Sequence, residues 1–204
     1  MRASRVEAFT DAVIAILITI MVLELPKPDG ADFAALSRDL PALLAYVLSF
    51  IYLGISWNNH HHIFVASQRV TGGVLLANLH VLFWLSLIPF TTAWMSEQKF
   101  AQVPVIAFGA ILLASGTAFT ILQGMLIRAD GPESRLAAAL GRNIKGKITL
   151  AGFALGIGLT FVDPRIGLAV YAVVVLSWLI PDRRIERTLQ DAEASEQAST
   201  TSKK

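Results

Sequence analysis

Six mainly apolar stretches alternate with polar segments along the chain. In a helix that rises ~1.5 Å per residue, a stretch of ~20 apolar residues spans the ~30 Å core of a bilayer. The pattern therefore predicts an all-α, polytopic membrane protein with six transmembrane helices. Their predicted positions are about 5–25, 41–64, 73–95, 102–127, 148–162 and 166–180. The last two stretches are short, so we interpret them as a hairpin.

The first apolar stretch differs from the others because it carries charges inside its length. Its sequence is RVEAFTDAVIAILITIMVLEL, which places Glu7 and Asp11 within the predicted span. A carboxylate that faces lipid would cost at least ~2.5 kcal/mol. We therefore expect a bundle to hold this helix, with its charged first turns facing protein or water. Ser4 and Glu7 fit a capping box, which predicts that the helix begins near Arg5.

The segments between the apolar stretches carry helix-ending and turn-forming residues. Phe33 and Leu36 are spaced as on one helical face, which predicts a short extracellular helix within 30–40. Pro41 suits the first turn of the next helix, and Pro89 predicts a kink in the third. The chain divides into a membrane domain over 1–182 and a polar tail over 183–204, for which we predict a disordered, cytoplasmic segment.

Composition agrees with a membrane protein and excludes several kinds of site. Hydrophobic residues make up 54% of the chain and charged residues 16%, whereas a soluble domain carries more charge. The absence of cysteine excludes disulfides and thiolate metal sites. The spacings of Walker, Rossmann, zincin and Ser-His-Asp sites are absent, as is the potassium-filter sequence TVGYG. We therefore expect no enzymatic activity, no cofactor and no nucleic-acid partner.

The basic residues are distributed unevenly across the predicted spans. Six spans place both termini on the same side of the membrane. Only Lys27, Arg38, Lys99 and Arg165 fall on the other side; every other Lys and Arg falls on the side of the termini. The positive-inside rule then predicts a multi-pass protein of the cell inner (plasma) membrane with both termini cytoplasmic.

An aliphatic stripe follows the first predicted helix. Ala12, Ile16, Ile20 and Leu23 are spaced i, i+4, i+8 and i+11, so they share one face. Such a stripe is typical of an ordinary core face. Thr19 interrupts the apolar run beside it, and a threonine hydroxyl in a membrane helix commonly bonds back to its own backbone.

The charged end of the first helix needs partners from other helices. Arg5 and Asp11 are six residues apart and lie on different faces, so they do not pair with each other. We expect their partners on the ends of helices 41–64 and 73–95 that lie beside them, forming a structural polar network. Glu24, at the other end of the first helix, is interpreted as a solvated charge or, in an oligomer, as part of an anionic ring that attracts cations.

Three consecutive histidines, His60, His61 and His62, resemble a metal site in composition but not in spacing. Consecutive helical residues point ~100° apart, so the three cannot converge on one ion. We expect no metal site there and favour polar contacts with the first helix. A contact between one of them and His80 is left open as a ligand pair.

The sequence Arg5-x-x-x-Phe9-Thr10-Asp11 resembles the RxxxFSD motif of the transmembrane protein 175 family, the endosomal/lysosomal potassium channels with small prokaryotic members. Thr10 stands where the family has serine, and both residues carry a hydroxyl. The segments AVIAILITIMVLEL and WNNHHHIF also resemble the family. The similarity is strongest over the first two helices. The resemblance implies six spans in each subunit of a homotetramer.

The resemblance also implies roles for particular residues. The first helix of each subunit would line a central pore, with a constriction or gate formed by Ile16, Ile20 and Leu23 and a selectivity layer at Thr19. Arg5, Phe9, Thr10 and Asp11 would support this pore helix. The implied function is passive, potassium-preferring conduction through a lipid bilayer, with other monovalent cations as further permeant ions.

Three other functions remain open from the residues alone. A proton-coupled secondary transporter would use Asp11, Glu7 and His80 as a proton relay. A membrane haem or metal protein would use His60–His62 and His80 as ligands. A purely structural membrane protein would carry no current at all.

Overall fold

The computed structural model describes residues 3–141 and 143–179, and its regular elements there are all helical. The long helices are α1 (Ala3–Leu23), α2 (Phe33–Ala66) and α5 (Gln102–Asp130); the shorter ones are α3 (Gly72–Ser86), α4 (Ile88–Glu97), α6 (Arg135–Leu140), α7 (Ile144–Thr160) and α8 (Pro164–Leu176), followed by a 3-10 turn at Ser177–Leu179. The predicted tail 183–204 lies outside the described residues.

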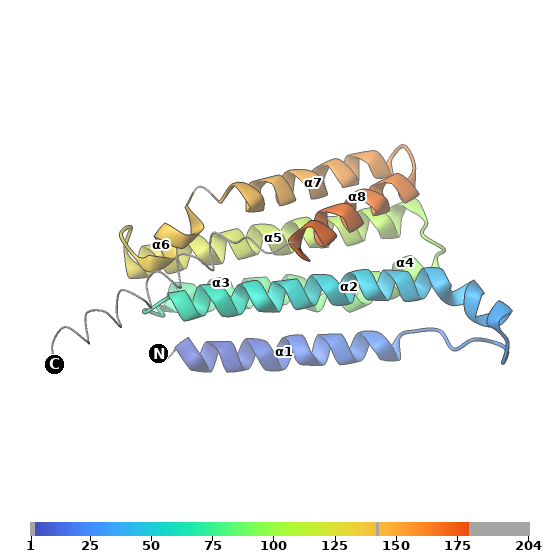
Figure 1. Cartoon of the computed structure of the whole chain (residues 1–204), viewed down its shortest axis with the longest axis horizontal. Coiled ribbons are helices and arrows are strands. Elements are labelled where there is room, and N and C mark those ends of the chain that lie inside the picture. The colour runs from blue at the N-terminus through green and yellow to red at the C-terminus, as the bar shows by residue number, and fades with distance from the viewer. Residues whose placement is uncertain (1–2, 142, 180–204) are drawn as a thin grey trace, which may run out of the picture.

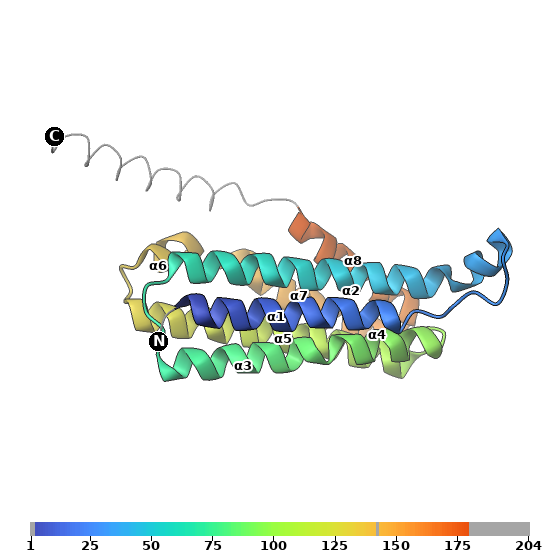
Figure 2. The same ribbon diagram turned by 90° about the horizontal axis from the view of Figure 1, so that it is seen from below.

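The helices form an elongated bundle in which α5 is central and α1 is peripheral (Figure 1). α5 packs against α3, α4, α7 and α8, whereas α1 packs against α2, α3 and α4 on one side only. Figure 2 shows α1 lying along the outside of the bundle between α2 and α3. The end of the bundle where α1 begins is called the N-terminal end below, and the opposite end is called the far end.

Four of these helical segments are long and apolar enough to cross a membrane, judged by length and composition. They are α1, α2, the α3–α4 pair and α5. α7 has 17 residues and α8 has 13, so at ~1.5 Å per residue they reach only about 25 and 20 Å, less than a ~30 Å bilayer core. The predicted hairpin is present, but its helices are shorter than full spans.

The kink predicted at Pro89 is confirmed. α3 ends at Ser86 and α4 begins at Ile88, with Pro89 in the first turn of α4. Proline has no backbone N–H and its ring clashes with the preceding turn, so the helix is interrupted immediately before it. The hydroxyls of Thr91 and Thr92 donate to the carbonyl of Ile88 at 3.2 and 2.8 Å, which satisfies polar groups near the interruption.

The structure differs from the sequence prediction around Pro41. The extracellular helix predicted within 30–40 and the helix predicted from 41 form one helix, α2, with Pro41 inside it. The Asp32 carboxylate accepts a hydrogen bond from the backbone N–H of Ala35 at 2.7 Å, so the helix is capped well before the proline. Figure 1 shows the first turns of α2 projecting beyond the rest of the bundle at the far end.

Candidate functional site

α1 has two faces with different surroundings. Its buried side chains are spaced 3 or 4 residues apart and face the other helices: Val6, Thr10, Ile14, Leu17 and Met21. The predicted stripe lies on the other side, where Ile16, Ile20 and Leu23 are 56%, 40% and 80% exposed. The interpretation of this stripe as ordinary core is therefore wrong for the single chain, because the stripe does not pack into it.

Polar groups accompany the stripe at two levels. Thr19 is exposed beside it, and its hydroxyl donates to the carbonyl of Ile16 at 2.8 Å, as expected for a membrane helix. A hydroxyl that donates in this way keeps its own lone pairs as acceptors. Glu24 is exposed just beyond the end of α1. The exposed face of α1 is thus mainly aliphatic, with one hydroxyl in the middle and one carboxylate at the far end.

Two parallel contacts join the charged turns of α1 to α2. The carboxylate of Glu7 lies 3.0 Å from Nδ1 of His61, and the Nε1–H of Trp57 donates to the carboxylate of Asp11 at 2.9 Å. Both pairs are four residues apart on each helix, in opposite order, as antiparallel neighbours require. The prediction that Asp11 finds its partner on the adjacent end of the second helix is confirmed.

A second, buried set of hydrogen bonds connects three helices. The Asn78 side-chain amide on α3 donates to the hydroxyl of Thr10 on α1 at 3.0 Å. The Oδ1 atom of Asn78 lies 2.8 Å from Nε2 of His60 on α2, and His60 stacks on Phe64. Buried hydrogen bonds of this kind fix the relative positions of the helices that they join, although the other ring nitrogen of His60, Nδ1, is buried without a hydrogen-bond partner among the described residues. Arg5 and Phe9, the other two motif residues, are exposed on the single chain.

The histidines make separate contacts. His60 is paired with Asn78 and His61 with Glu7, while His80 accepts a hydrogen bond from Nε1 of Trp84 at 2.8 Å. The suggested meeting of one of the consecutive histidines with His80 is therefore not observed. Over 3–141 and 143–179, the structure has no group of three or more His, Asp or Glu side chains placed to hold a metal ion.

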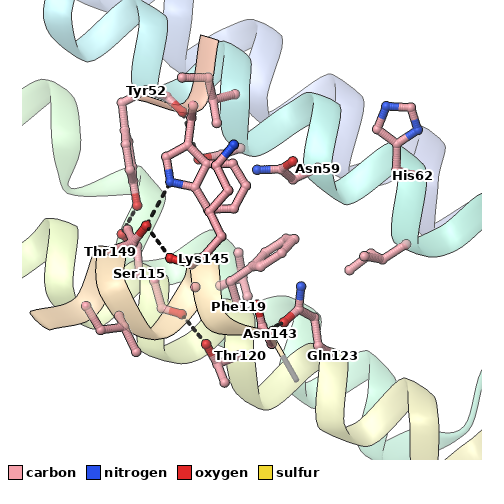
Figure 3. A pocket seen from close by; sticks show the side chains of 18 of the residues that line it. Tyr52, Asn59, His62, Ser115, Phe119, Thr120, Gln123, Asn143, Lys145 and Thr149 are labelled. Atoms are coloured by element: carbon pink, nitrogen blue, oxygen red, sulfur yellow. Dashed lines mark hydrogen bonds between the residues drawn. The ribbon is translucent and has the colours of Figure 1, made fainter. Parts of the chain in front are cut away.

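Two features of this arrangement differ from what the sequence predicts. Trp57 and Asn78 were not identified as partners of α1, although an asparagine inside the apolar run GGVLLANLHVLFW is itself a signal of a buried polar contact. A cavity of about 530 Å³ between α2, α5 and α7 was also not expected. Figure 3 shows its lining side chains, among them Tyr52, whose hydroxyl pairs with that of Ser115 at 2.6 Å.

Comparison with known protein families gives a match over the first helices. The family described as "Endosomal/lysosomal potassium channel TMEM175" matches residues 5–89, which cover α2, α3 and all but the first two residues of α1. The match thus includes the stripe on α1 and every hydrogen bond described above between α1, α2 and α3.

Relatives extend the similarity over most of the chain. A protein of Chryseobacterium sp. named as a potassium channel is 49% identical over 191 residues, which cover 94% of this chain and 100% of that protein. A potassium channel of Streptomyces collinus is 33% identical over 185 residues, 85% and 90% of the two chains. The human protein named "Endosomal/lysosomal proton channel TMEM175" is 34% identical over 112 residues, which cover 49% of this chain and 22% of the human one.

A solved structure has a similar fold. The crystal structure of a TMEM175 homolog from Chamaesiphon minutus, described as a lysosomal potassium-selective channel, superposes with a TM-score of 0.72. The superposition covers 87% of this chain and 96% of the homolog at 25% sequence identity. The similarity therefore includes the α7–α8 hairpin region as well as the N-terminal helices.

Proposed function

The chain belongs to the TMEM175 family of channels, and on that premise we propose that it conducts potassium passively across a membrane as a homotetramer. It is a multi-pass membrane protein of a family of channels rather than of enzymes. The observation that carries the proposal is the aliphatic face of α1, which the single chain leaves exposed at Ile16, Ile20 and Leu23.

The position of α1 in the bundle suits a central axis. α1 lies on the outside of its own chain, so rotational symmetry can bring the α1 helices of several copies together. α1 is bound to α2 through the exposed pair Asp11–Trp57 and to α3 through the buried pair Thr10–Asn78. In this proposal the motif residues Arg5, Phe9, Thr10 and Asp11 support the pore helix, and the face that carries Ile16, Ile20 and Leu23 lines the pore.

The residues of the exposed face then have distinct roles. Rings of Ile16, Ile20 and Leu23, each one turn from the next, form a constriction that closes by excluding water. The Thr19 hydroxyls replace part of the hydration shell of a cation with their lone pairs, giving a preference for potassium without a rigid cage. Glu24 from each subunit forms an anionic ring at the far end of the pore that concentrates cations.

We further propose that the N-terminal end of the bundle faces the cytoplasm, in the cell inner (plasma) membrane. The described basic residues Arg5, Arg69, Arg128, Lys145 and Lys147 lie at or near that end, on the first turns of α1 and α7, the last turn of α5 and the α2–α3 loop. Lys and Arg flanking membrane helices are retained on the cytoplasmic side. Glu24 would then face the outside.

Ion flux through purified protein in liposomes tests the proposal. A potassium gradient is expected to give flux above that of empty vesicles, with a smaller flux under a matched sodium gradient. Ile16→Asn is expected to raise the flux, because an amide in the constriction stabilises water there. Val173→Asn is the matched control: Val173 is 68% exposed on α8, away from α1, and its variant should conduct as the unmodified protein does.

The same liposomes separate the competing functions. Absence of flux for either cation, or an Ile16→Asn flux equal to that of the unmodified protein, would contradict the proposed pore. Uptake that saturates and requires a proton gradient would favour the proton-coupled transporter instead. Proton flux is a necessary second readout, because the human relative is named as a proton channel.

A further inference from the structure

The α7–α8 hairpin covers the bundle over only part of its length. α5 has 29 residues, about 44 Å, whereas α7 and α8 reach about 25 and 20 Å. The turn of the hairpin lies at the far end, where the side-chain amide of Gln102 at the start of α5 donates to the carbonyl of Thr160 at 3.2 Å. α8 therefore ends at Leu176, well short of the N-terminal end, as Figure 1 shows, and near that end the short helix α6 contacts α2 and α5 instead.

The cavity of about 530 Å³ lies between the end of α8 and the α6–α7 connection, and Figure 3 shows its lining. Its walls come from α2, α3, α5 and α7, from the residues before α7, and from the end of α8 with its 3-10 turn. The volume falls within the range of about 300–1,000 Å³ that is typical of small-molecule sites. It is separate from the exposed face of α1, because no residue of α1 lines it.

One part of the cavity wall is apolar. Ile55 of α2, Leu85 of α3, Phe119 of α5, and Leu150 and Phe153 of α7 contribute side chains without polar groups. Transfer of apolar surface of this kind from water to hydrocarbon is favourable, by roughly 25 cal/mol for each Å². A chain of methylene groups therefore suits this part of the cavity better than water does.

The other part is polar and carries positive rather than negative charge. Asn143 donates to the side-chain oxygen of Gln123 at 2.9 Å, and the side chain of Asn59 points into the cavity (Figure 3). The ammonium of Lys145 lies 4.5 Å above the ring of Trp178. Among the described residues that line the cavity, none is acidic.

The start of α7 adds donors to this polar part. α7 begins at Ile144, and the Asn143 side chain makes no capping hydrogen bond to it. The first backbone N–H groups of a helix have no partner within the helix and carry a partial positive charge. Ile144, Lys145 and Gly146 line the cavity, so this helix end and the Lys145 ammonium lie together.

We propose that this cavity binds an acyl chain that carries an anionic head group, with the chain against the apolar wall and the head group at Lys145 and the start of α7. The surroundings of the cavity fit a ligand from the bilayer. Ile144 and Ile148 are exposed on α7 nearby. Trp and Lys side chains are typical of membrane interfaces, because each has an apolar ring or stem and a polar tip. A phospholipid and a free fatty acid share this chemistry.

Native mass spectrometry of the full chain in mild detergent tests the proposal, with phosphatidylglycerol, phosphatidylcholine and oleate added separately after lipid removal. One anionic lipid should be retained per chain at about tenfold lower concentration than phosphatidylcholine, because charge-assisted hydrogen bonds hold its head group. The comparison of phosphatidylglycerol with oleate identifies which source supplies the acyl chain. This binding does not depend on which ion the chain conducts.

Two pairs of variants locate the binding. Thr120 and Thr117 are exposed threonines of α5 whose hydroxyls bond to backbone carbonyls, but only Thr120 lines the cavity. Thr120→Trp should fill the cavity and reduce retention of anionic lipid about tenfold or more, whereas Thr117→Trp should not. Lys145→Gln should remove the preference over phosphatidylcholine, whereas Lys147→Gln, outside the cavity and exposed, should keep it.

Several outcomes would overturn the proposal. Retention of no lipid by the unmodified chain would do so, as would equal retention of phosphatidylglycerol, oleate and phosphatidylcholine. Unchanged binding in Thr120→Trp, with a melting temperature like that of Thr117→Trp, would place the lipid elsewhere. If Thr120→Trp does not fold, the comparison of Lys145→Gln with Lys147→Gln tests the proposal alone. An equal preference for anionic lipid over phosphatidylcholine in these two variants would exclude the proposed head-group site.

Discussion

α1 and α5 are both apolar helices long enough to cross a membrane, but the chain packs them differently. α5 is surrounded by α3, α4, α7 and α8. α1 is held on one face by apolar contacts and hydrogen bonds, and its other face is left exposed. α5 is therefore the helix on which the fold depends, whereas the exposed face of α1 is available for contacts outside the single chain.

The largest expected effect comes from comparing two neighbouring residues of α1, one on its buried face and one on its exposed face. Leu17 is 7% exposed and Ile16 is 56% exposed, so Leu17 faces the core of the chain and Ile16 faces away from it. Leu17→Ala should lower the free energy of unfolding by about 2–5 kcal/mol, because it leaves a cavity in the core. Ile16→Ala should leave the fold of each chain intact and change the ion flux. Chemical unfolding in detergent together with liposome flux measures both.

Equal stability losses in these two variants would contradict the two-faced description of α1. A loss of stability without any change of flux in Ile16→Ala would assign its side chain to a structural contact between chains rather than to the constriction.

Two glycines of α5, Gly109 and Gly124, have different surroundings. A side chain at Gly109 would meet the ring and hydroxyl of Tyr171 on α8, whereas Gly124 has open space around it. Gly109→Ala should therefore destabilise the chain by about 1–3 kcal/mol through overpacking. Gly124→Ala should raise stability by up to ~1 kcal/mol, because alanine favours the helix. Thermal unfolding of the two variants in the same detergent compares them.

The test is the difference in stability between Gly109→Ala and its control, Gly124→Ala, rather than the size of the loss in Gly109→Ala alone. If Gly109→Ala is as stable as Gly124→Ala, the contact between α5 and Tyr171 does not constrain the helices, and α5 is not the rigid centre of the bundle.

The polar contacts of α1 should contribute different amounts to the free energy of unfolding, depending on how deeply each contact is buried. Asn78→Ala removes the partners of both Thr10 and His60, which are buried, and should cost about 1–3 kcal/mol. Trp57→Phe removes the donor to the exposed Asp11 and should cost about 1 kcal/mol or less, because water can replace it. Unfolding curves of the two variants measure the difference, and the reverse order would show that Asp11 is the main anchor of α1.

The smallest effect on stability is expected at Thr19. Its hydroxyl bonds only to the carbonyl of Ile16 in its own helix, so Thr19→Val should change the free energy of unfolding by less than about 0.5 kcal/mol. The ratio of potassium to sodium flux should fall towards one, because the lone pairs are lost. An unchanged ratio would remove Thr19 from the proposed selectivity layer. Thr117→Val on α5 is the control, since Thr117 makes the same kind of bond outside the pore.

The sequence predicted the helices better than it predicted their lengths. The apolar runs and Pro89 indicated where helices lie and where the third is interrupted, because hydrophobicity and proline geometry act locally. The extension of α2 through Pro41 escaped prediction, since the Asp32 cap and the apolar residues after it outweigh one lost hydrogen bond. The polar contact predicted between the consecutive histidines and the first helix is confirmed by His61 and Glu7, but the charged turn of α1 did not indicate that Trp57 and Asn78 would also be its partners.

The amino-acid sequence is enough to predict a helical membrane protein, the aliphatic stripe of α1 and the motif that resembles the channel family, because each is a pattern of neighbouring residues. The packing of the helices shows that the stripe lies outside the chain's own core and that Thr10, Asn78 and His60 form one buried set. It also shows that α8 ends at Leu176 and that a cavity lies beside Lys145. These features depend on how helices far apart in the sequence pack together, which no local pattern specifies.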